Sequence, residues 1–217
     1  MFERSFPPLH AIVDVAAAGQ AGWEPAALAA AYLDGGATFL QVRGKDMGSA
    51  PLLSLCQRIV ALARPRAAAV IVNDRVDVAK LAGAAGVHVG QDDLSPADAR
   101  AILGPDAIVG FSTHTLAQVE QAVREPISYL AVGPVFGTTT KNTGYAAVGL
   151  ELIAAAARAA GACPIVSIGG ITLDNAPSVL AAGATSVAVP EPASWLFVVV
   201  GMVVLGMRRK RRHSERV

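Results

Sequence analysis

One repeated pattern dominates the sequence: a short apolar run is followed by polar or small residues and then by apolar residues at helical spacing. Eight apolar runs alternate with seven helical stretches. This order is typical of parallel βα units, and eight such units close into a (β/α)8 barrel. We therefore expect strands at residues 9–13, 38–42, 68–72, 87–89, 107–111, 129–132, 164–168 and 185–189, and helices at 25–33, 50–63, 76–82, 116–124, 150–160 and 173–182, with one more that starts at Pro96 after an N-capping Ser95.

A doubly wound open sheet is the alternative arrangement of βα units. Such a sheet usually concentrates its polar residues at one switch point. In this chain, charged or small residues follow nearly every expected strand at its C-terminal end. We expect the barrel for this reason, with a site built from the loops on its C-terminal face.

The charge distribution separates a body from a C-terminal tail. Six of the 18 Lys and Arg residues lie in the last ten positions, and two of the 17 acidic residues lie beyond residue 189. The body therefore holds 12 basic and 15 acidic residues, a net charge of −3, which argues against nucleic-acid binding. Cys56 and Cys163 show no metal or redox spacing, so we expect two buried thiols. The first residues contain no long apolar segment, and we expect no secretory signal there.

The loop after the sixth expected strand is rich in groups that bind anions. Threonine hydroxyls donate hydrogen bonds to phosphate oxygens, and a lysine adds a point charge. The segment predicts a phosphate site at a strand end, with a polar surface loop as the alternative. Its four residues are Thr138, Thr139, Thr140 and Lys141.

Other strand ends carry matching chemistry. Gln41, Arg43 and Lys45 alternate, so they lie on one face as the second strand ends, where cations suit a polyanion and the amide suits a planar heterocycle. Asp74 and Asp93 end neighbouring strands and predict a Mg²⁺ site, because Mg²⁺ binds a few carboxylates together with substrate phosphates. Further hydrogen bonds, or close approach of the backbone to a phosphate, are expected at Asn73, Ser112, Gly169 and Gly170.

Several of these groups also have a structural interpretation. Asp74 could form a surface salt bridge with Arg75, and Asp92-Asp93 could cap the next helix. His114 follows the fifth expected strand and is either an acid–base group or a helix-start residue packed at the rim. We slightly favour the packed residue.

Six segments form an ordered set of motifs that runs from about residue 8 to 189. They are Gln41-Val-Arg-Gly-Lys45, Val72-Asn-Asp-Arg75, Gly86-Val-His-Val-Gly-Gln-Asp-Asp-Leu94, Gly110-Phe-Ser-Thr-His114, Gly133-Pro-Val-Phe-Gly-Thr-Thr-Thr-Lys141 and Ile168-Gly-Gly-Ile171. The set resembles the thiamine phosphate synthase family. The resemblance implies a (β/α)8 barrel and a Mg²⁺-dependent transferase of thiamine biosynthesis. That enzyme condenses 4-amino-2-methyl-5-(diphosphooxymethyl)pyrimidine with thiazole phosphate, giving thiamine phosphate and diphosphate.

The resemblance also implies roles for individual residues. The pyrimidine diphosphate would be held by Gln41, Arg43, Lys45, Asn73, Ser112 and Lys141. The thiazole phosphate would be held by Thr138 and Thr140, with Thr139 beside them, and by a glycine of Gly169-Gly170. Mg²⁺ would be held by Asp74 and Asp93, and the catalytic groups would be Arg43, Lys45, Ser112 and Lys141.

The implied reaction needs no protein nucleophile, in agreement with the lack of an obviously activated Ser or Cys. Diphosphate would leave an electron-rich aminopyrimidine methylene carbon, and the thiazole nitrogen would attack it. The related thiazole tautomerases share the barrel and a histidine near the position of His114, but they do not need the diphosphate-binding set. The presence of that set favours the synthase.

After Val189 the family pattern stops. The chain continues with Pro190-Glu191-Pro192, then 15 apolar or small residues at 193–207, then five cations at 208–212. This order resembles a PEP-CTERM sorting tail. We expect a barrel domain at 1–189 that lacks a normal eighth helix, followed by a tail at 190–217 with a C-terminal hydrophobic helix.

The tail affects both location and activity. As a helix, residues 193–207 would span roughly 22 Å against a hydrocarbon core of about 30 Å, and we favour a membrane segment over a helix packed on the barrel. We expect a cytoplasmic enzyme held at the inner membrane by this helix, with small-molecule substrates and an oligomeric state that the sequence does not define. Pro190 has no N–H to donate to a phosphate, which predicts weakened binding of thiazole phosphate. An inactive barrel that carries a sorting tail is the non-enzymatic alternative.

Overall fold

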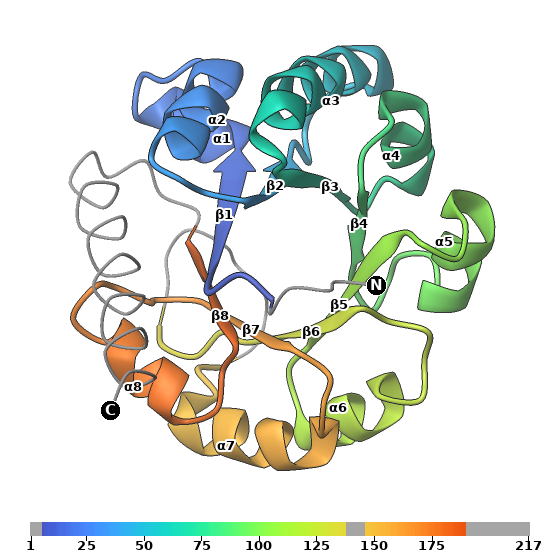
Figure 1. Ribbon diagram of the computed structural model, residues 1–217. Helices are drawn as coiled ribbons and strands as arrows, with labels where there is room; N and C mark the ends of the chain where they lie inside the picture. Colours follow the sequence, from blue (N-terminus) through green and yellow to red (C-terminus); the bar gives the residue numbers. More distant parts are fainter. Residues whose placement is uncertain (1–5, 138–145, 190–217) are drawn as a thin grey trace, which may run out of the picture.

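The computed structural model describes residues 6–137 and 146–189, and within them the expected barrel is present. Eight strands pair in chain order, all parallel, and β8 pairs with β1 to close the ring (Figure 1). The strands are β1 (Leu9–Asp14), β2 (Phe39–Arg43), β3 (Ala69–Asn73), β4 (Gly86–Val89), β5 (Ile108–Thr113), β6 (Tyr129–Val132), β7 (Ile165–Ile168) and β8 (Ser186–Val189).

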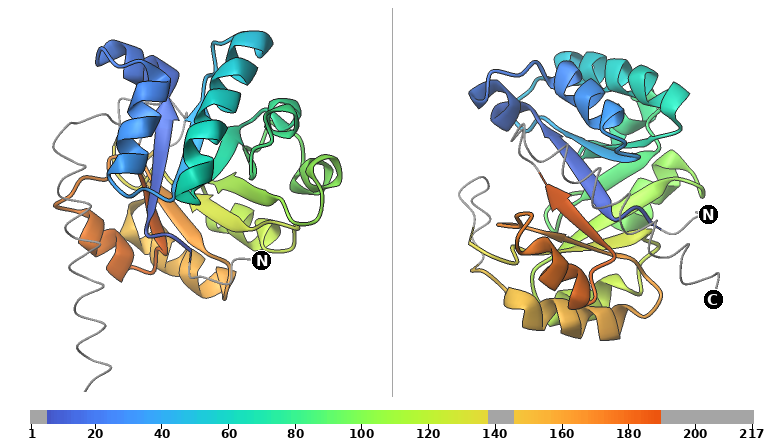
Figure 2. Two further views of the ribbon diagram at one scale, coloured as in Figure 1. Left: turned by 45° about the horizontal axis from the view of Figure 1, so that its top comes forward. Right: turned by 60° about the vertical axis from the view of Figure 1, so that its left-hand side comes forward.

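The helices form a layer outside the strands, as the two side views in Figure 2 show. Each lies between two consecutive strands, with α1 and α2 both in the first connection. They are α1 (Val15–Gln20), α2 (Pro25–Asp34), α3 (Ser49–Ala63), α4 (Val76–Ala82), α5 (Pro96–Leu103), α6 (Leu116–Ala122), α7 (Gly149–Ala160) and α8 (Ala176–Ala181), with a 3₁₀ turn at Arg64–Arg66.

Helix α1 was not expected from the sequence. It is short, and its start is fixed by Asp14, whose Oδ1 accepts a hydrogen bond from the backbone N–H of Ala17 at 3.0 Å. The sequence signal for α1 was an N-capping aspartate followed by a short run of alanines. The helix propensity of so short a run is too weak to distinguish a helix from a loop. By contrast, the predicted Ser95 cap of α5 is confirmed, with Pro96 in the first turn.

The start of α8 was placed three residues too early. Asn175 keeps residues 172–175 in a turn, because its Oδ1 accepts from the N–H of Thr172 at 2.7 Å and its Nδ2 donates to the carbonyl of Gly170 at 3.0 Å. Pro177 then lies in the first turn of the helix, where its missing N–H costs nothing. The chain after Val189, including the predicted absence of the next helix and the hydrophobic segment, lies outside the described residues.

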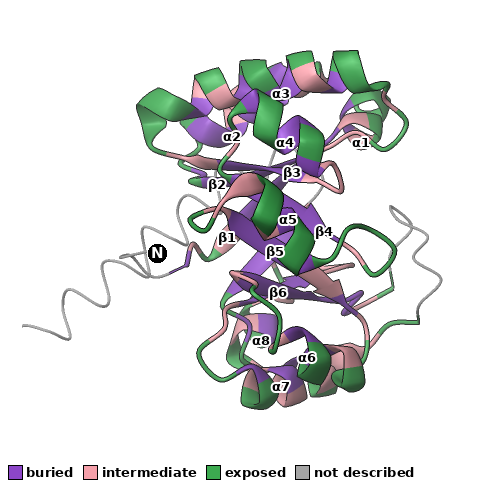
Figure 3. Cartoon of the chain, turned by 90° about the vertical axis from the view of Figure 1, so that its right-hand side faces the viewer, coloured by how far each residue is buried: buried purple, intermediate pink, exposed green. Residues whose placement is uncertain are grey.

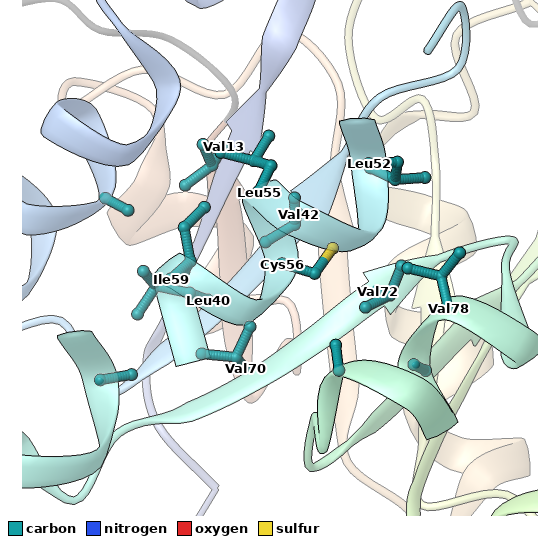
Figure 4. Packing of buried hydrophobic residues seen from close by; sticks show 14 of the residues in the cluster. Val13, Leu40, Val42, Leu52, Leu55, Cys56, Ile59, Val70, Val72 and Val78 are labelled. Atoms are coloured by element: carbon teal, nitrogen blue, oxygen red, sulfur yellow. The ribbon is translucent and has the colours of Figure 1, made fainter. Parts of the chain in front are cut away.

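The core has an outer and an inner layer, because successive strand residues point to opposite faces. In Figure 3 the strands are mostly buried, whereas the helices around them carry most of the exposed residues. The outer layer packs strands against helices. In Figure 4, Leu55, Cys56 and Ile59 of α3 lie against Leu40 and Val70 of the barrel wall. Cys56 is fully buried as predicted, whereas Cys163 is only partly buried.

The inner layer fills the barrel itself. Its apolar part contains Phe6, Phe39 and Tyr129, with ring centroids 5.1 to 5.9 Å apart, and small or branched side chains beside them. The buried polar residues His10, Gln41 and His88 lie among these rings and side chains. The lumen is therefore packed rather than open, and a ligand must approach from a rim. In the part of the chain that the structure describes, no helix is long and apolar enough to cross a membrane.

Candidate active site

The polar side chains of β2 point into the barrel where the strand ends. Gln41 and Arg43 alternate with the wall residues Leu40 and Val42, as predicted. Gln41 is buried and touches His10 of β1, with 3.2 Å between the two Nε2 atoms. Arg43 lies half-buried at the rim. The strand thus places an amide low in the barrel and a cation above it.

Arg43 is held by an ion pair with Asp14, a residue to which the sequence analysis gave no role. The two residues face each other in the β1–β2 register, and the guanidinium donates to Asp14 Oδ2. The signal available in the sequence was a carboxylate at the C-terminal end of the neighbouring strand.

Lys45 follows β2 and pairs with the carboxylate of Asp74, with 3.5 Å between Nζ and Oδ2. The predicted alternative for Asp74, a salt bridge with Arg75, is wrong. Arg75 instead binds Asp77 through two hydrogen bonds of 2.5 and 2.9 Å. Asp74 adopts a left-handed backbone conformation with φ of 63°, and its carboxylate pairs with Lys45 rather than with Arg75. Asn73 ends β3 just before this turn and is half-buried.

Asp93 lies in the turn after β4, and β4 is the strand that pairs with β3. Its Oδ2 accepts the backbone N–H of Gly90 at 2.7 Å, and Ser95 rather than Asp93 caps α5. β3 and β4 pair directly, and the N–H of Asp74 donates to the carbonyl of His88, so both aspartates belong to adjacent strand ends. Among the described residues there is no group of three or more His, Cys, Asp and Glu side chains that could hold a metal.

The side chain of Ser112 on β5 contacts His88, and His88 contacts Tyr129 in turn. The sequence analysis gave neither His88 nor Tyr129 a role. His88 Nε2 lies 2.8 Å from Ser112 Oγ, and His88 Nδ1 lies 2.8 Å from the hydroxyl of Tyr129. Burial raises the pKa of Tyr129 well above its ordinary value, and a hydrogen bond from Gln41 opposes this shift. Both residues stand in expected strands, and period-two alternation would have turned them inward.

Gly169 and Gly170 have positive φ angles of 100° and 62°, so the turn after β7 requires glycine. A Cβ at Gly169 would lie 2.6 Å from Pro134 Cβ, and one at Gly170 would lie 2.6 Å from the carbonyl oxygen of Gly137. The two glycines therefore let this turn pack against the segment after β6. Their proposed approach to a phosphate remains a prediction.

The predicted phosphate loop itself, Thr138 to Lys141, lies outside the described residues. The residues just before it are described. Val135 and Phe136 donate backbone hydrogen bonds to the carbonyls of Ile168 and Gly169, at 2.9 and 3.0 Å. The chain therefore enters the loop beside the turn after β7.

His114 lies between β5 and α6. Its Nδ1 is 2.5 Å from the carbonyl oxygen of Gly133, and its backbone N–H donates to Gln118 Oε1 at 2.7 Å. These contacts describe a residue that joins two strand ends at the rim. They leave its chemical role a prediction.

Comparison with known proteins gives a consistent result. Residues 9–192 match the family model described as thiamine monophosphate synthase. A thiamine-phosphate synthase of Anaeromyxobacter dehalogenans is 46% identical over 170 residues, which is 78% of this chain and 76% of that protein. One from Koribacter versatilis is 43% identical over 84% of this chain and 87% of its own.

Solved structures agree with these relatives. The thiamine phosphate pyrophosphorylase of Pyrococcus furiosus superposes with a TM-score of 0.75 at 31% identity, covering 84% of each chain. A structure named native KDPGal, at 15% identity and a TM-score of 0.62, shares the fold alone. With the family model covering most of its length and relatives above 40% identity, the chain belongs to the thiamine monophosphate synthase family.

Proposed function

We propose that this protein is a thiamine-phosphate synthase that condenses 4-amino-2-methyl-5-(diphosphooxymethyl)pyrimidine with thiazole phosphate. The observation that carries the proposal is the gathering of Gln41, Arg43, the Lys45–Asp74 pair and Ser112 at one rim of a barrel from this family. A polyanion with a heterocyclic head matches this set, because cations lie at the rim and neutral hydrogen-bonding groups lie below it.

The chemistry follows from charge. The bond between the pyrimidine methylene carbon and the diphosphate oxygen breaks, and the electron pair leaves with diphosphate. The thiazole nitrogen then supplies the pair for the new C–N bond. Arg43, Lys45 and Lys141 would stabilise the growing negative charge, and fixed cations at that point lower the barrier. Ser112 would orient the pyrimidine, while Thr138, Thr139, Thr140 and Gly169-Gly170 would hold the thiazole phosphate.

The carboxylates suit a hard cation. Asp74 and Asp93 offer only oxygen donors from adjacent strand ends, and two carboxylates plus substrate phosphates are a usual set for Mg²⁺. Bound there, Mg²⁺ would neutralise charge on the leaving diphosphate. Lys45, already paired with Asp74, would then turn toward the phosphates.

The test is formation of thiamine phosphate and release of diphosphate by the purified, detergent-solubilised chain with both substrates and Mg²⁺. We expect turnover that is lost on chelation and restored by Mg²⁺. Asp93→Ala and Lys141→Ala should lose at least 100-fold in kcat/KM, about 2.7 kcal/mol of transition-state stabilisation. Asp98→Ala, on α5 behind the rim, is the matched control and should retain activity. An active Asp93→Ala variant that ignores chelation would refute the metal assignment.

We further propose that residues 190–217 form a membrane-directed sorting tail behind a barrel domain at 1–189, which would hold a cytoplasmic enzyme at the inner membrane. The support is the order of Pro-Glu-Pro, 15 apolar or small residues and five cations, which keep the basic end on the cytoplasmic side. Fractionation of cells that express the full chain, beside a chain ending at Val189, tests this. The full chain should sediment with membranes and the shortened chain should not. Equal distribution would overturn it.

A further inference from the structure

A chain of hydrogen bonds crosses the inside of the barrel below the rim. It links His10 on β1 to Gln41 on β2, then Tyr129 on β6, His88 on β4 and finally Ser112 on β5. The heavy-atom distances are 3.2 Å from Gln41 to His10 and 2.8 Å on each side of the His88 ring. The chain thus joins five of the eight strands.

Water has little access to this chain until its last member. His10, Gln41, Tyr129 and His88 expose 1%, 4%, 0% and 7% of their surface, whereas Ser112 is half-buried at the rim. Buried polar groups in such a place usually bond to each other, although His10 Nδ1, at the far end of the chain, has no hydrogen-bond partner among the described residues. The direction of each hydrogen bond is therefore set by the neighbouring groups in the chain.

The direction can be followed from Gln41. Its amide nitrogen can only donate, so His10 Nε2 accepts. The hydroxyl of Tyr129 is fully buried, so its single proton needs an acceptor within the barrel. His88 Nδ1, 2.8 Å away, is that acceptor.

This fixes the form of His88. A neutral imidazole whose Nδ1 accepts carries its proton on Nε2. That N–H donates to Ser112 Oγ, so the serine hydroxyl hydrogen is free to point toward the rim. At the other end, the Gln41 amide nitrogen donates to His10, and the carbonyl oxygen of the same amide can only accept.

We propose that Tyr129 is a positioning residue that holds His88 in the Nε2-protonated form, so that Ser112 offers a donor and Gln41 an acceptor to the bound pyrimidine. The proposal rests on the proposed function for its substrate. A 4-aminopyrimidine presents the complementary pattern, since its ring nitrogens accept and its exocyclic amine donates.

The backbone of β5 makes room for this contact. Gly110 lies in register with both His88 and Tyr129, between them in the barrel wall. A Cβ at Gly110 would lie 2.3 Å from the Tyr129 hydroxyl and 2.5 Å from His88 Nδ1. The hydroxyl and the ring nitrogen thus occupy the space that any other residue on β5 would fill.

The first test reads the imidazole directly. The full chain, labelled with ¹⁵N-histidine, should show His88 with Nε2 protonated and Nδ1 unprotonated, the signal being assigned by its loss in His88→Gln. In Tyr129→Phe, Nδ1 loses its donor and the ring should populate the other form. A wild-type ring protonated on Nδ1 would overturn the proposal, and this reading needs neither substrate nor turnover.

The second test is kinetic. Tyr129→Phe should raise KM for the pyrimidine diphosphate roughly 5- to 10-fold, the range of one buried hydrogen bond, and leave KM for thiazole phosphate within about twofold. Tyr32→Phe is the matched control, because it removes another buried tyrosine hydroxyl. Tyr32 belongs to α2, outside the barrel, and its hydroxyl lies 3.5 Å from the carbonyl oxygen of Ile12. Tyr32→Phe should change neither KM.

The outcomes separate the two claims. If the wild-type chain makes no thiamine phosphate, the proposed function fails, while the ¹⁵N spectrum still decides the state of His88. If the chain turns over and Tyr129→Phe changes both Michaelis constants equally, or neither, then Tyr129 is structural only and the positioning role is refuted.

Discussion

Asp14 and Arg43 face each other at the ends of β1 and β2 and form an ion pair in which 7% and 18% of the side chains remain exposed. The second carboxylate oxygen of Asp14 accepts the N–H of Ala17 and so caps α1. One carboxylate therefore fixes a cation of the proposed diphosphate site and also starts a helix.

These two roles can be separated by substitution. Asp14→Asn keeps a good N-cap but removes the charge beside Arg43, so KM for the pyrimidine diphosphate should rise and the free energy of unfolding should fall by about 1.5–3 kcal/mol. Asp14→Ala should lose about 1 kcal/mol more, because the cap is lost as well. Urea unfolding and steady-state kinetics measure both effects. Equal stability of the two variants would show that the cap contributes nothing.

Asp74 should matter for activity far more than for stability. Its contact with Lys45 is 3.5 Å long and half-exposed, and such pairs contribute below about 1 kcal/mol. Asp74→Asn suits the left-handed backbone at this position, so the unfolding midpoint should stay within a few degrees while kcat/KM falls at least 100-fold. Asp77→Asn, which breaks the exposed Arg75–Asp77 pair, is the control and should leave kcat/KM unchanged. Parallel losses in both variants would contradict a specific role for Asp74.

The repeating pattern predicted the barrel well because parallel strands in a barrel are buried on both faces. Their apolar runs stand out from the turns, and Tyr129–Val132 and Val76–Ala82 match the expected bounds. The predicted helix positions were wrong where a side-chain hydrogen bond decides the local structure. Asp14 starts an extra helix, and Asn175 delays α8, and neither effect appears in hydrophobic periodicity.

The candidate site was predictable only where chemistry and strand ends coincide. Gln41 and Arg43 lie on the face where alternation put them, and Ser112, named because it follows the fifth expected strand, lies near the end of β5. His88 and Tyr129 received no role, because a buried His or Tyr inside an apolar run looks like core until its partner on another strand is known. Pairing across the barrel, between residues 41 positions apart, is information that spacing along the chain does not carry.

Gly110 tests whether the space beside Tyr129 is needed. Gly110→Ala should lower the free energy of unfolding by about 1–3 kcal/mol or more, since the new Cβ would meet the Tyr129 ring at 2.1 Å. Gly19→Ala is the control, because Gly19 lies in α1 with nothing within 4 Å of the added Cβ. It should stabilise by up to about 1 kcal/mol. Chemical denaturation compares the two variants. An unchanged free energy of unfolding in Gly110→Ala would mean that the barrel wall can accommodate the added methyl group.

His10 should make the barrel sensitive to acid. Burial, reinforced by His88, lowers the pKa of His10 well below its ordinary value of 6.5, so below pH 6.5 the unfolded chain binds a proton that the folded chain excludes. The stability from this residue is therefore present above pH 6.5 and is lost as pH falls below it, by up to about 1.4 kcal/mol per pH unit. His10→Gln, whose carbonyl can still accept from Gln41, should show a shallower slope in urea unfolding between pH 4.5 and 6.5, a range set by that ordinary pKa. Equal slopes would contradict this assignment.

The join between β8 and the tail gives a prediction about the second substrate. β8 ends at Val189, and the next residue, Pro190, has no N–H at a strand end where backbone donors suit a phosphate. Pro190→Ser restores an N–H and a hydroxyl, so KM for thiazole phosphate should fall several-fold while KM for the pyrimidine diphosphate stays constant. Pro192→Ser is the matched control, two residues further on, and should change neither constant. If Pro190→Ser leaves the KM for thiazole phosphate unchanged, the missing N–H of Pro190 does not limit binding of that substrate. The proline after β8 then does not weaken the affinity for thiazole phosphate.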